Sequence, residues 1–149
     1  MSEAYDALKL DHQLCFPLYA ASRAVIRLYH PHLSALDLTY TQYIALMALW
    51  ERSPQSVKEL GERLYLDTGT LTPLLKAMEQ KGWILRARSE ADERSVRISL
   101  TEAGRSLREK ALDIPAKVGS CIPLPPQRAQ QLYELLYELL DHTKVKLPV

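Results

Sequence analysis

The chain has almost no net charge. Its 19 Lys and Arg residues stand against 18 Asp and Glu residues, and the formal net charge is +1. Overall charge therefore provides no argument for binding to nucleic acid, and a DNA-binding interpretation must rest on where the basic residues lie. Between Lys76 and Lys110, nine Lys or Arg residues stand against six Asp or Glu residues, a modest local excess. A dimer would present that excess twice to one side of a duplex.

Cysteine is scarce as well. The two cysteines, Cys15 and Cys121, form no C-x-x-C motif, and a disulfide between them would be an event rather than a permanent cross-link. The four histidines do not join the cysteines at the spacing of metal ligands. They are His12, His30, His32 and His142. We therefore expect neither a metal site nor a cofactor.

Long apolar runs are missing too. The chain starts with MSEAYDALKL, which is acidic and has no apolar segment, so we expect no signal peptide and no membrane span. The expected compartment is the reducing cytoplasm, where both cysteines rest as free thiols. The chain has 149 residues, 47% of them hydrophobic, and we predict a single domain over residues 1–149. The predicted fold class is mainly α with a small two-stranded antiparallel wing.

A helix-turn-helix pattern lies at the centre of the chain. Ser56 and Glu59 form the S-x-x-E pattern of a capping box, which predicts a short first helix. A second helix is predicted over about Thr68–Lys81, because its apolar residues repeat at helical spacing and Gly82 follows as a stop. The apolar stripe consists of Leu71, Leu74, Leu75 and Met78. The opposite face is small at its start and carries Lys76 midway, the profile of a helix that enters a major groove.

Two strand-like runs follow, at residues 84–88 and 95–100, in which polar and apolar residues alternate. The polar stretch between them predicts the tip of a hairpin, the wing of a winged helix. Arg94 near that tip suits the narrow, electronegative minor groove. We expect Asp92 to hold the Arg94 guanidinium in one orientation.

Taken singly, each of these polar residues is better explained as part of a solvated surface. The order of helix, turn, helix and basic-tipped hairpin favours DNA binding instead, with double-stranded operator DNA as the partner. The predicted DNA-binding residues are Thr68, Gly69, Thr70, Thr72, Pro73, Lys76, Arg86, Asp92 and Arg94.

The flanking segments are predicted to be helical. Residues 4–30 carry an apolar stripe, and a kink or break is expected at Pro17 because proline lacks an amide hydrogen. Residues 30–32, His-Pro-His, are predicted as a boundary. A capping box of Thr39 and Gln42 then begins a helix that reaches about residue 51.

After the wing, we predict one long helix over residues 101–117, a stretch of helix breakers over 119–126, and a last helix over 127–144. Both ends of the chain carry more apolar helical surface than a small winged domain needs. This surplus predicts a homodimer built from the terminal helices. The alternative is that these faces only cover the core of their own domain.

The segments LYLDTGTLTPLLKAMEQKG and RSEADERSVRISLTEAG resemble the winged helix-turn-helix of MarR-type repressors, and Asp92-Glu93-Arg94 matches the D-x-R wing segment of that family. The resemblance covers nearly the whole chain. It implies a DNA-binding region over residues 39–101 and dimerisation helices over residues 1–38 and 102–149.

The segments LCF at 14–16 and LDLTYTQY at 36–43 resemble one branch of this family, the OhrR-like sensors of organic hydroperoxides. This resemblance implies a dimeric repressor that releases its operator when a hydroperoxide oxidises Cys15. It further implies that Tyr19 and Tyr29 hydrogen-bond that thiol across the dimer, and that Tyr40 shapes the pocket. The two-cysteine members of the branch carry a resolving thiol in the region of Cys121.

The chemistry of the site agrees with this implication. Peroxides are attacked by thiolates, so the thiol has to ionise near neutral pH. The positive end of a helix that begins near Cys15 favours the ionised form, and phenol hydroxyls donate hydrogen bonds without adding a competing charge. The apolar side chains of Phe16, Leu18 and Trp50 would favour organic hydroperoxides over hydrogen peroxide.

Three alternatives stay open. Cys15 on its own is typical of a small buried hydrophobic residue. A MarR-type regulator could instead bind a phenolic or other small ligand in the same crevice, without redox chemistry. A thiol peroxidase is disfavoured because the chain lacks a thioredoxin-like βαβ pattern and a C-x-x-C motif, so we predict a regulator and not an enzyme.

Overall fold

The structure, a computed structural model, describes residues 3–92 and 94–143. Two short 3-10 helices come first, η1 (Glu3–Leu8) and η2 (Leu10–His12). The helices are α1 (Cys15–Ser34), α2 (Tyr40–Glu51), α3 (Val57–Leu64), α4 (Thr68–Gln80), α5 (Glu102–Ala111), α6 (Ile114–Gly119) and α7 (Pro126–Thr143). The strands are β1 (Gln55–Ser56), β2 (Ile84–Arg88) and β3 (Val96–Leu100). The predicted fold class, mainly α with a small antiparallel wing, is confirmed.

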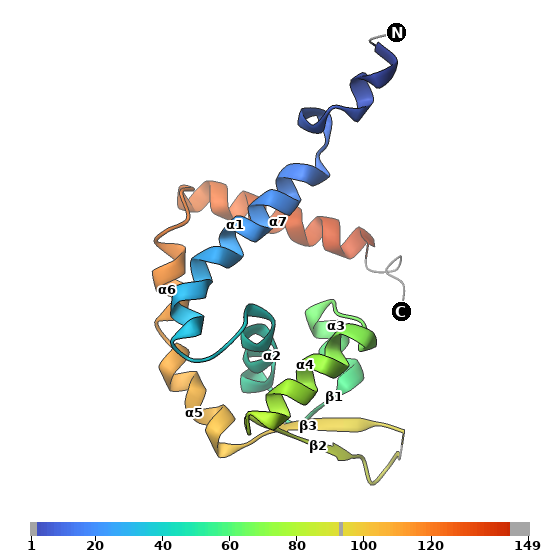
Figure 1. The fold of residues 1–149 in the computed structure, drawn as a ribbon, viewed down its shortest axis with the longest axis vertical. Coiled ribbons are helices and arrows are strands. Elements are labelled where there is room, and N and C mark those ends of the chain that lie inside the picture. Colours follow the sequence, from blue (N-terminus) through green and yellow to red (C-terminus); the bar gives the residue numbers. More distant parts are fainter. Residues whose placement is uncertain (1–2, 93, 144–149) are drawn as a thin grey trace.

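The elements divide into two ends joined along one side (Figure 1). Helices α1 and α7 occupy one end, where they overlap in this view, and the 3-10 helices project beyond them. Helices α2, α3 and α4 lie with the sheet at the other end, while α5 and α6 run between the two.

The core lies where α2, α3, α4 and the sheet meet. Its fully buried side chains include Leu46, Leu49, Leu60, Leu71, Leu75, Met78, Ile84 and Ile98. Three of the four apolar positions predicted for α4 are among them, and the fourth, Leu74, is half-buried against the same cluster. Burial of one helical stripe in this way orients α4, because its opposite face must then point to solvent.

Both predicted capping boxes are present. The Thr39 hydroxyl accepts a hydrogen bond from the Gln42 amide at 3.2 Å, and the Gln42 side chain accepts one from the Thr39 amide at 3.0 Å. Ser56 and Glu59 make the same pair at the start of α3, at 3.0 and 2.7 Å. A cap of this kind contributes about 1 kcal/mol. These four side chains thus set where α2 and α3 begin.

The sheet has three strands and not two. Strand β1 pairs antiparallel with β3, with Gln55 opposite Ile98, so the strand order is β1-β3-β2. Gln55 is buried, and its amide nitrogen donates to the carbonyl oxygens of Ala48 at 2.8 Å and Arg52 at 2.6 Å. A two-residue strand is too short to show an alternating pattern, so β1 could not be predicted from the sequence.

The predictions about proline in α1 had different outcomes. The break expected at Pro17 lies just before it, because η2 ends at His12 and α1 begins at Cys15, with Pro17 in its first turn, where a proline has no intrahelical amide bond to lose. The boundary predicted at residues 30–32 was wrong, since α1 continues through Pro31 to Ser34. The last turn is anchored by Leu33, which is 2% exposed in the core.

The helix predicted over residues 101–117 is two helices. Helix α5 ends at Ala111, and α6 begins at Ile114 with Pro115 in its first turn. Pro115 has no amide hydrogen for the carbonyl one turn back, so the chain breaks and restarts. The break turns Ile114 and Val118 into the core, where both are buried. The last predicted helix is found as α7, and Lys144 lies outside the described residues.

Candidate DNA-binding face and thiol site

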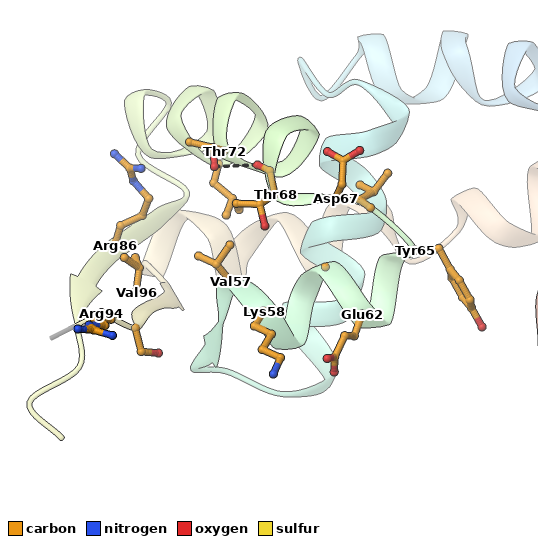
Figure 2. Close-up of a pocket in the computed structure, with 14 residues that line it drawn as sticks. Val57, Lys58, Glu62, Tyr65, Asp67, Thr68, Thr72, Arg86, Arg94 and Val96 are labelled. Carbon is orange, nitrogen blue, oxygen red and sulfur yellow. Dashed lines mark hydrogen bonds between the residues drawn. The ribbon is translucent and has the colours of Figure 1, made fainter. Parts of the chain in front are cut away.

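Helix α4 begins at a side-chain cap. The Asp67 carboxylate accepts a hydrogen bond from the Thr70 amide at 2.7 Å, and this bond lowers the pKa of Asp67. A Cβ at Gly69 would come within 3.3 Å of that carboxylate oxygen, so glycine leaves the cap room. The Thr72 hydroxyl donates to the Thr68 carbonyl at 2.8 Å (Figure 2).

The face of α4 opposite the core has the predicted character. Its exposed residues are Thr68, Gly69, Thr70, Pro73 and Lys76, and Thr72 is half-buried beside them. Small and hydroxyl side chains occupy the first turns, and one lysine follows. Nothing bulky on this face hinders close approach to a groove.

A groove runs between α3, α4 and the wing. It is lined on the helical side by Lys58, Thr68 and Thr72, and on the wing side by Arg86 and Arg94 (Figure 2). The structure thus brings together predicted residues from two separate stretches of sequence. Lys58, exposed in the first turn of α3, was missed because a lysine in a short capped helix has no distinguishing pattern.

Short-range hydrogen bonds join the described residues on the two sides of the wing tip. The Ser89 amide donates to the Ser95 carbonyl at 2.8 Å, and the Ser95 amide donates to the Asp92 carbonyl at 3.0 Å. The Asp92 carboxylate accepts from the backbone amide of Arg94, also at 3.0 Å. The expected contact of Asp92 with the Arg94 guanidinium is therefore corrected. Asp92 shapes the backbone of the turn, and the Arg94 side chain is left exposed.

Arg86 is tied to the recognition helix. Its backbone amide donates to one oxygen of Glu79 at 3.0 Å, and its guanidinium donates to the other at 3.2 Å. The side-chain bond is the main reason that the pKa of Glu79 is lowered. The Arg86 Nε atom is buried and has no hydrogen-bond partner among the described residues. A DNA contact by Arg86 stays a prediction. The Arg86 side chain is already held against α4 by Glu79.

Cys15 is the first residue of α1, and it is a free, exposed thiol. Its apolar neighbours Leu14 and Phe16 are also exposed, Leu14 to 83%. Tyr19 lies one turn further along the helix, and its hydroxyl accepts a hydrogen bond from Arg23 at 3.3 Å. The Arg23 guanidinium also lies over the Tyr19 ring, 5.4 Å from its centroid. Arg23, which the sequence did not single out, therefore fixes the tyrosine nearest to the thiol.

Tyr29 and Tyr40 form the other half of the predicted thiol site. Their rings meet edge to face with centroids 5.0 Å apart, and Tyr43 lies 5.8 Å from Tyr29. Burial raises the pKa of Tyr40 and of Tyr43, and the neighbouring Tyr29 adds to both shifts. These phenols therefore stay protonated and remain hydrogen-bond donors. Tyr43 is 3% exposed and belongs to the core.

Cys15 and the tyrosine cluster are far apart within one chain. Tyr29 follows Cys15 by 14 residues on the same helix, which at 1.5 Å per residue separates them by about 21 Å along its axis. Of the two predicted tyrosines on α1, Tyr19 lies one turn from the thiol and Tyr29 does not. A second chain is needed to bring a Tyr29 to Cys15.

Trp50 and Cys121 lie away from Cys15 along the chain. The Trp50 indole nitrogen donates to the Gly104 carbonyl at 2.9 Å, so this ring holds α2 against α5. Trp50 was expected beside the thiol, but the structure shows no contact between Trp50 and Cys15 among the described residues. Cys121 is an exposed free thiol in the turn after α6, where its amide donates to the Val118 carbonyl at 2.9 Å.

Known proteins match this architecture. Residues 27–111 match the family described as transcriptional regulator SarA/Rot. The chain is 52% identical over 141 residues to the organic hydroperoxide resistance transcriptional regulator of Bacillus subtilis (strain 168), covering 95% of this chain and 96% of that protein. The chain belongs to the MarR-like winged-helix family of transcriptional regulators. Its resemblance to the organic hydroperoxide branch is thereby confirmed.

Two solved structures of one relative are informative. The reduced AbfR bound to DNA is 36% identical, with a TM-score of 0.76 over 95% of this chain and 98% of that chain. The disulfide-formed AbfR is 35% identical, with a TM-score of 0.65 over 95% of this chain and 96% of that chain. AbfR comes from Staphylococcus epidermidis. The relatives are transcriptional regulators, which confirms that this MarR-like chain is not an enzyme.

The described part of this MarR-like regulator holds no group of three or more His, Cys, Asp or Glu side chains arranged to bind a metal. None of its described helices is long and apolar enough to cross a membrane. Large apolar side chains remain exposed on α1 and α7, among them Phe16, Leu18, Val25, Ile26, Leu132, Leu135 and Leu139. Exposed apolar side chains gathered in this way are typical of protein–protein interaction surfaces.

Proposed function

We propose that this MarR-like regulator is a dimeric repressor that senses organic hydroperoxides by oxidation of Cys15 and then releases its operator DNA. One observation carries the proposal. The exposed thiol of Cys15 begins a 20-residue helix, beside Tyr19 and far from the Tyr29–Tyr40 pair. A relative that is 52% identical is an organic hydroperoxide resistance regulator, which supports the choice of signal.

The DNA-binding half of the proposal assigns residues 39–101 to operator recognition. Helix α4 enters the major groove with its exposed face, and the wing reaches the minor groove with Arg94. The predicted contacts are those of Thr68, Gly69, Thr70, Thr72, Pro73, Lys76, Arg86, Asp92 and Arg94, with Lys58 added from the groove in Figure 2. Because the protein acts on operator DNA, we place it in the cytoplasm.

Residues 1–38 and 102–149 are assigned to the dimer. The exposed apolar side chains of α1 and α7 belong to these segments, and burying them against a second copy is favourable. A two-fold dimer also places a Tyr29 from one chain near Cys15 of the other when the two α1 helices run antiparallel. Assembly of the dimer therefore completes the thiol site.

The proposed chemistry starts from the Cys15 thiolate. Its sulfur attacks the terminal oxygen of R–O–O–H, the O–O bond breaks, and RO⁻ leaves to take up a proton as the alcohol ROH. Sulfur keeps the OH group as a sulfenic acid and loses two electrons, which the peroxide gains. Phenol donors on Tyr19 and Tyr29 stabilise the thiolate without a competing charge.

A second step involves Cys121. The Cys121 thiol attacks the sulfenic sulfur of Cys15 in the partner, forming a disulfide and releasing water. The two Cα atoms must come within about 7 Å for this bond to form. Cys121 lies in a turn between α6 and α7, so its approach would pull on both helices. The resulting shift of the two recognition helices would lose their match to successive major grooves.

The test is a gel shift on the DNA upstream of the protein's own gene, with and without cumene hydroperoxide. Reduced protein should bind, one equivalent of hydroperoxide per subunit should release the DNA, and dithiothreitol should restore binding. A Cys15→Ser protein should bind and ignore the hydroperoxide. Release of the Cys15→Ser protein by hydroperoxide would contradict the proposal. Release by a phenolic compound alone would instead indicate a non-covalent ligand.

A further inference from the structure

Helix α1 ends in a left-handed residue that is not glycine. The Leu38 amide donates to the Leu33 carbonyl at 2.9 Å, and the Asp37 amide donates to the Ser34 carbonyl at 3.0 Å, which is the Schellman pattern. Asp37 has φ = 57° in this motif, where glycine is the usual residue. An aspartate therefore occupies a position that backbone geometry alone would give to glycine.

Helix α4 ends in the same pattern. The Trp83 amide donates to the Met78 carbonyl at 3.1 Å, and the Gly82 amide donates to the Glu79 carbonyl at 2.9 Å. Here the left-handed residue is Gly82, with φ = 78°. The C-cap residue of α4, directly before Gly82, is Lys81.

Lys81 joins the two helix ends. Its ammonium donates to the Asp37 carbonyl at 2.6 Å and lies 3.1 Å from the Asp37 carboxylate. The same ammonium sits 4.7 Å from the ring centroid of Trp83, which is buried. The carbonyl end of a helix is its negative pole, so one cation here is favoured by both α1 and α4. An exposed ion pair alone would hardly restrict the Lys81 side chain. The Asp37 carbonyl and the Trp83 ring restrict it further.

The loop that Lys81 holds is also the loop between the tyrosines. Asp37 lies three residues before Tyr40 and eight after Tyr29, and those two rings are in contact. A movement of these rings that changes the α1–α2 connection would therefore also move the Asp37 carbonyl. Lys81 is hydrogen-bonded to that carbonyl, so the displacement would reach the end of α4.

We propose that Lys81 is a positioning residue that links the redox state of the thiol site to the orientation of the recognition helix, through its bonds to Asp37. The proposal rests on the function proposed above, because it needs oxidation of Cys15 to change operator binding. It assigns to Lys81 a role in transmission and none in the reaction with peroxide or in contact with DNA.

The test uses Lys81→Met, Asp37→Asn and the double variant in the full-length protein. Asn tolerates the left-handed conformation and keeps the backbone carbonyl, so Asp37→Asn removes only the charge. Three quantities are measured: the rate of Cys15 oxidation by cumene hydroperoxide, and the operator Kd of the reduced and of the oxidised protein. Lys81→Met should leave the oxidation rate within about twofold and shrink the ratio of the two Kd values at least about fivefold. Lys81→Arg should restore most of the ratio.

Lys117→Met is the matched control. It removes a lysine that also pairs with an aspartate, Asp113, but within the single helix α6 and its cap. This variant should keep the wild-type Kd ratio. Asp37→Asn should reduce the ratio less than Lys81→Met, and the double variant should match Lys81→Met, since both changes act on one link.

The outcomes separate this proposal from the one on which it rests. If wild-type protein keeps its operator after Cys15 is oxidised, the proposed function fails. If wild type releases DNA and Lys81→Met shows the same Kd ratio as wild type, transmission runs through the α2–α4 core and the role of Lys81 is refuted. If Lys81→Met does not fold, a wild-type Kd ratio in Asp37→Asn gives the same refutation.

Discussion

Glu79 of the recognition helix accepts two hydrogen bonds from Arg86 of the wing, one from its backbone amide at 3.0 Å and one from its guanidinium at 3.2 Å. One carboxylate thus holds both the backbone and the side chain of Arg86 in the middle of β2. In the proposed complex, helix α4 and the wing reach different DNA grooves at the same time. Their relative position therefore depends in part on this single contact.

Replacing Glu79 by Gln should loosen the wing and weaken operator binding about threefold to tenfold, while Cys15 oxidises at the wild-type rate. Fluorescence anisotropy on operator DNA measures the first effect, and thiol titration measures the second. Because Arg86 holds the pKa of Glu79 below its ordinary value of 4.5, the stabilising effect is complete above that value and is lost as the pH falls through the lowered pKa. Wild type and Glu79→Gln should therefore differ in urea unfolding at neutral pH and converge once the pH has fallen below the lowered pKa of Glu79. A difference that persists in acid would contradict the assigned charge effect.

The wing and the helix should respond differently to loss of a cation. Lys76→Ala should weaken binding to all sequences alike and reduce the slope of log K against log salt by about one unit, since it contacts only backbone phosphate. Arg94→Ala should weaken operator binding more, because it loses a contact in the minor groove. Salt titrations of operator and random DNA check both. Unchanged operator affinity in Arg94→Ala would refute the wing assignment.

The tyrosine cluster should affect the rate of sensing and leave DNA binding intact. Tyr29→Phe keeps the ring contact with Tyr40 but removes a hydroxyl donor, so Cys15 should oxidise more slowly, by about tenfold for one lost hydrogen bond to a charged group. The affinity of the reduced protein for operator DNA should be the same as in wild type. Tyr5→Phe, in the exposed η1 segment, serves as the control and should oxidise at the wild-type rate. Equal rates for Tyr29→Phe and wild type would remove Tyr29 from the thiol site.

Cys121 should decide whether oxidation links two chains. Organic hydroperoxide should produce a covalent dimer on a non-reducing gel, reversed by dithiothreitol and absent in Cys121→Ser. Both cysteines are exposed in the single chain, so neither is hindered from reacting by its own fold. If the oxidised wild type runs as a monomer while the operator is released, Cys121 is a bystander and the sulfenic acid alone is the switch.

Two glycines should behave in opposite ways. A Cβ at Gly104 would overlap the Trp83 carbonyl oxygen, so Gly104→Ala should lower the free energy of unfolding by about 1–3 kcal/mol. Gly119, at the end of α6, has nothing within 4 Å of such a Cβ, and Gly119→Ala should leave stability unchanged or raise it slightly. Urea unfolding measures both. A stable Gly104→Ala protein would mean that α5 can move away from the turn after α4.

Much of the local structure was determined by the sequence itself. The capping boxes of Thr39 and Ser56, the buried stripe of α4 and the stop at Gly82 were all predicted correctly. Each depends on groups three or four residues apart, where spacing and residue type decide the outcome. The same is true of the wing, whose strands pair across a short tip.

The tertiary structure decided what depends on distant groups. Pro31 stays helical because Leu33 is buried in the core, and β1 exists because Gln55 meets Ile98 across 43 residues of chain. Lys81 finds Asp37 only because two helix ends converge, 44 residues apart. Sequence periodicity does not predict such contacts, because their free energy depends on packing that forms only when the whole chain has folded.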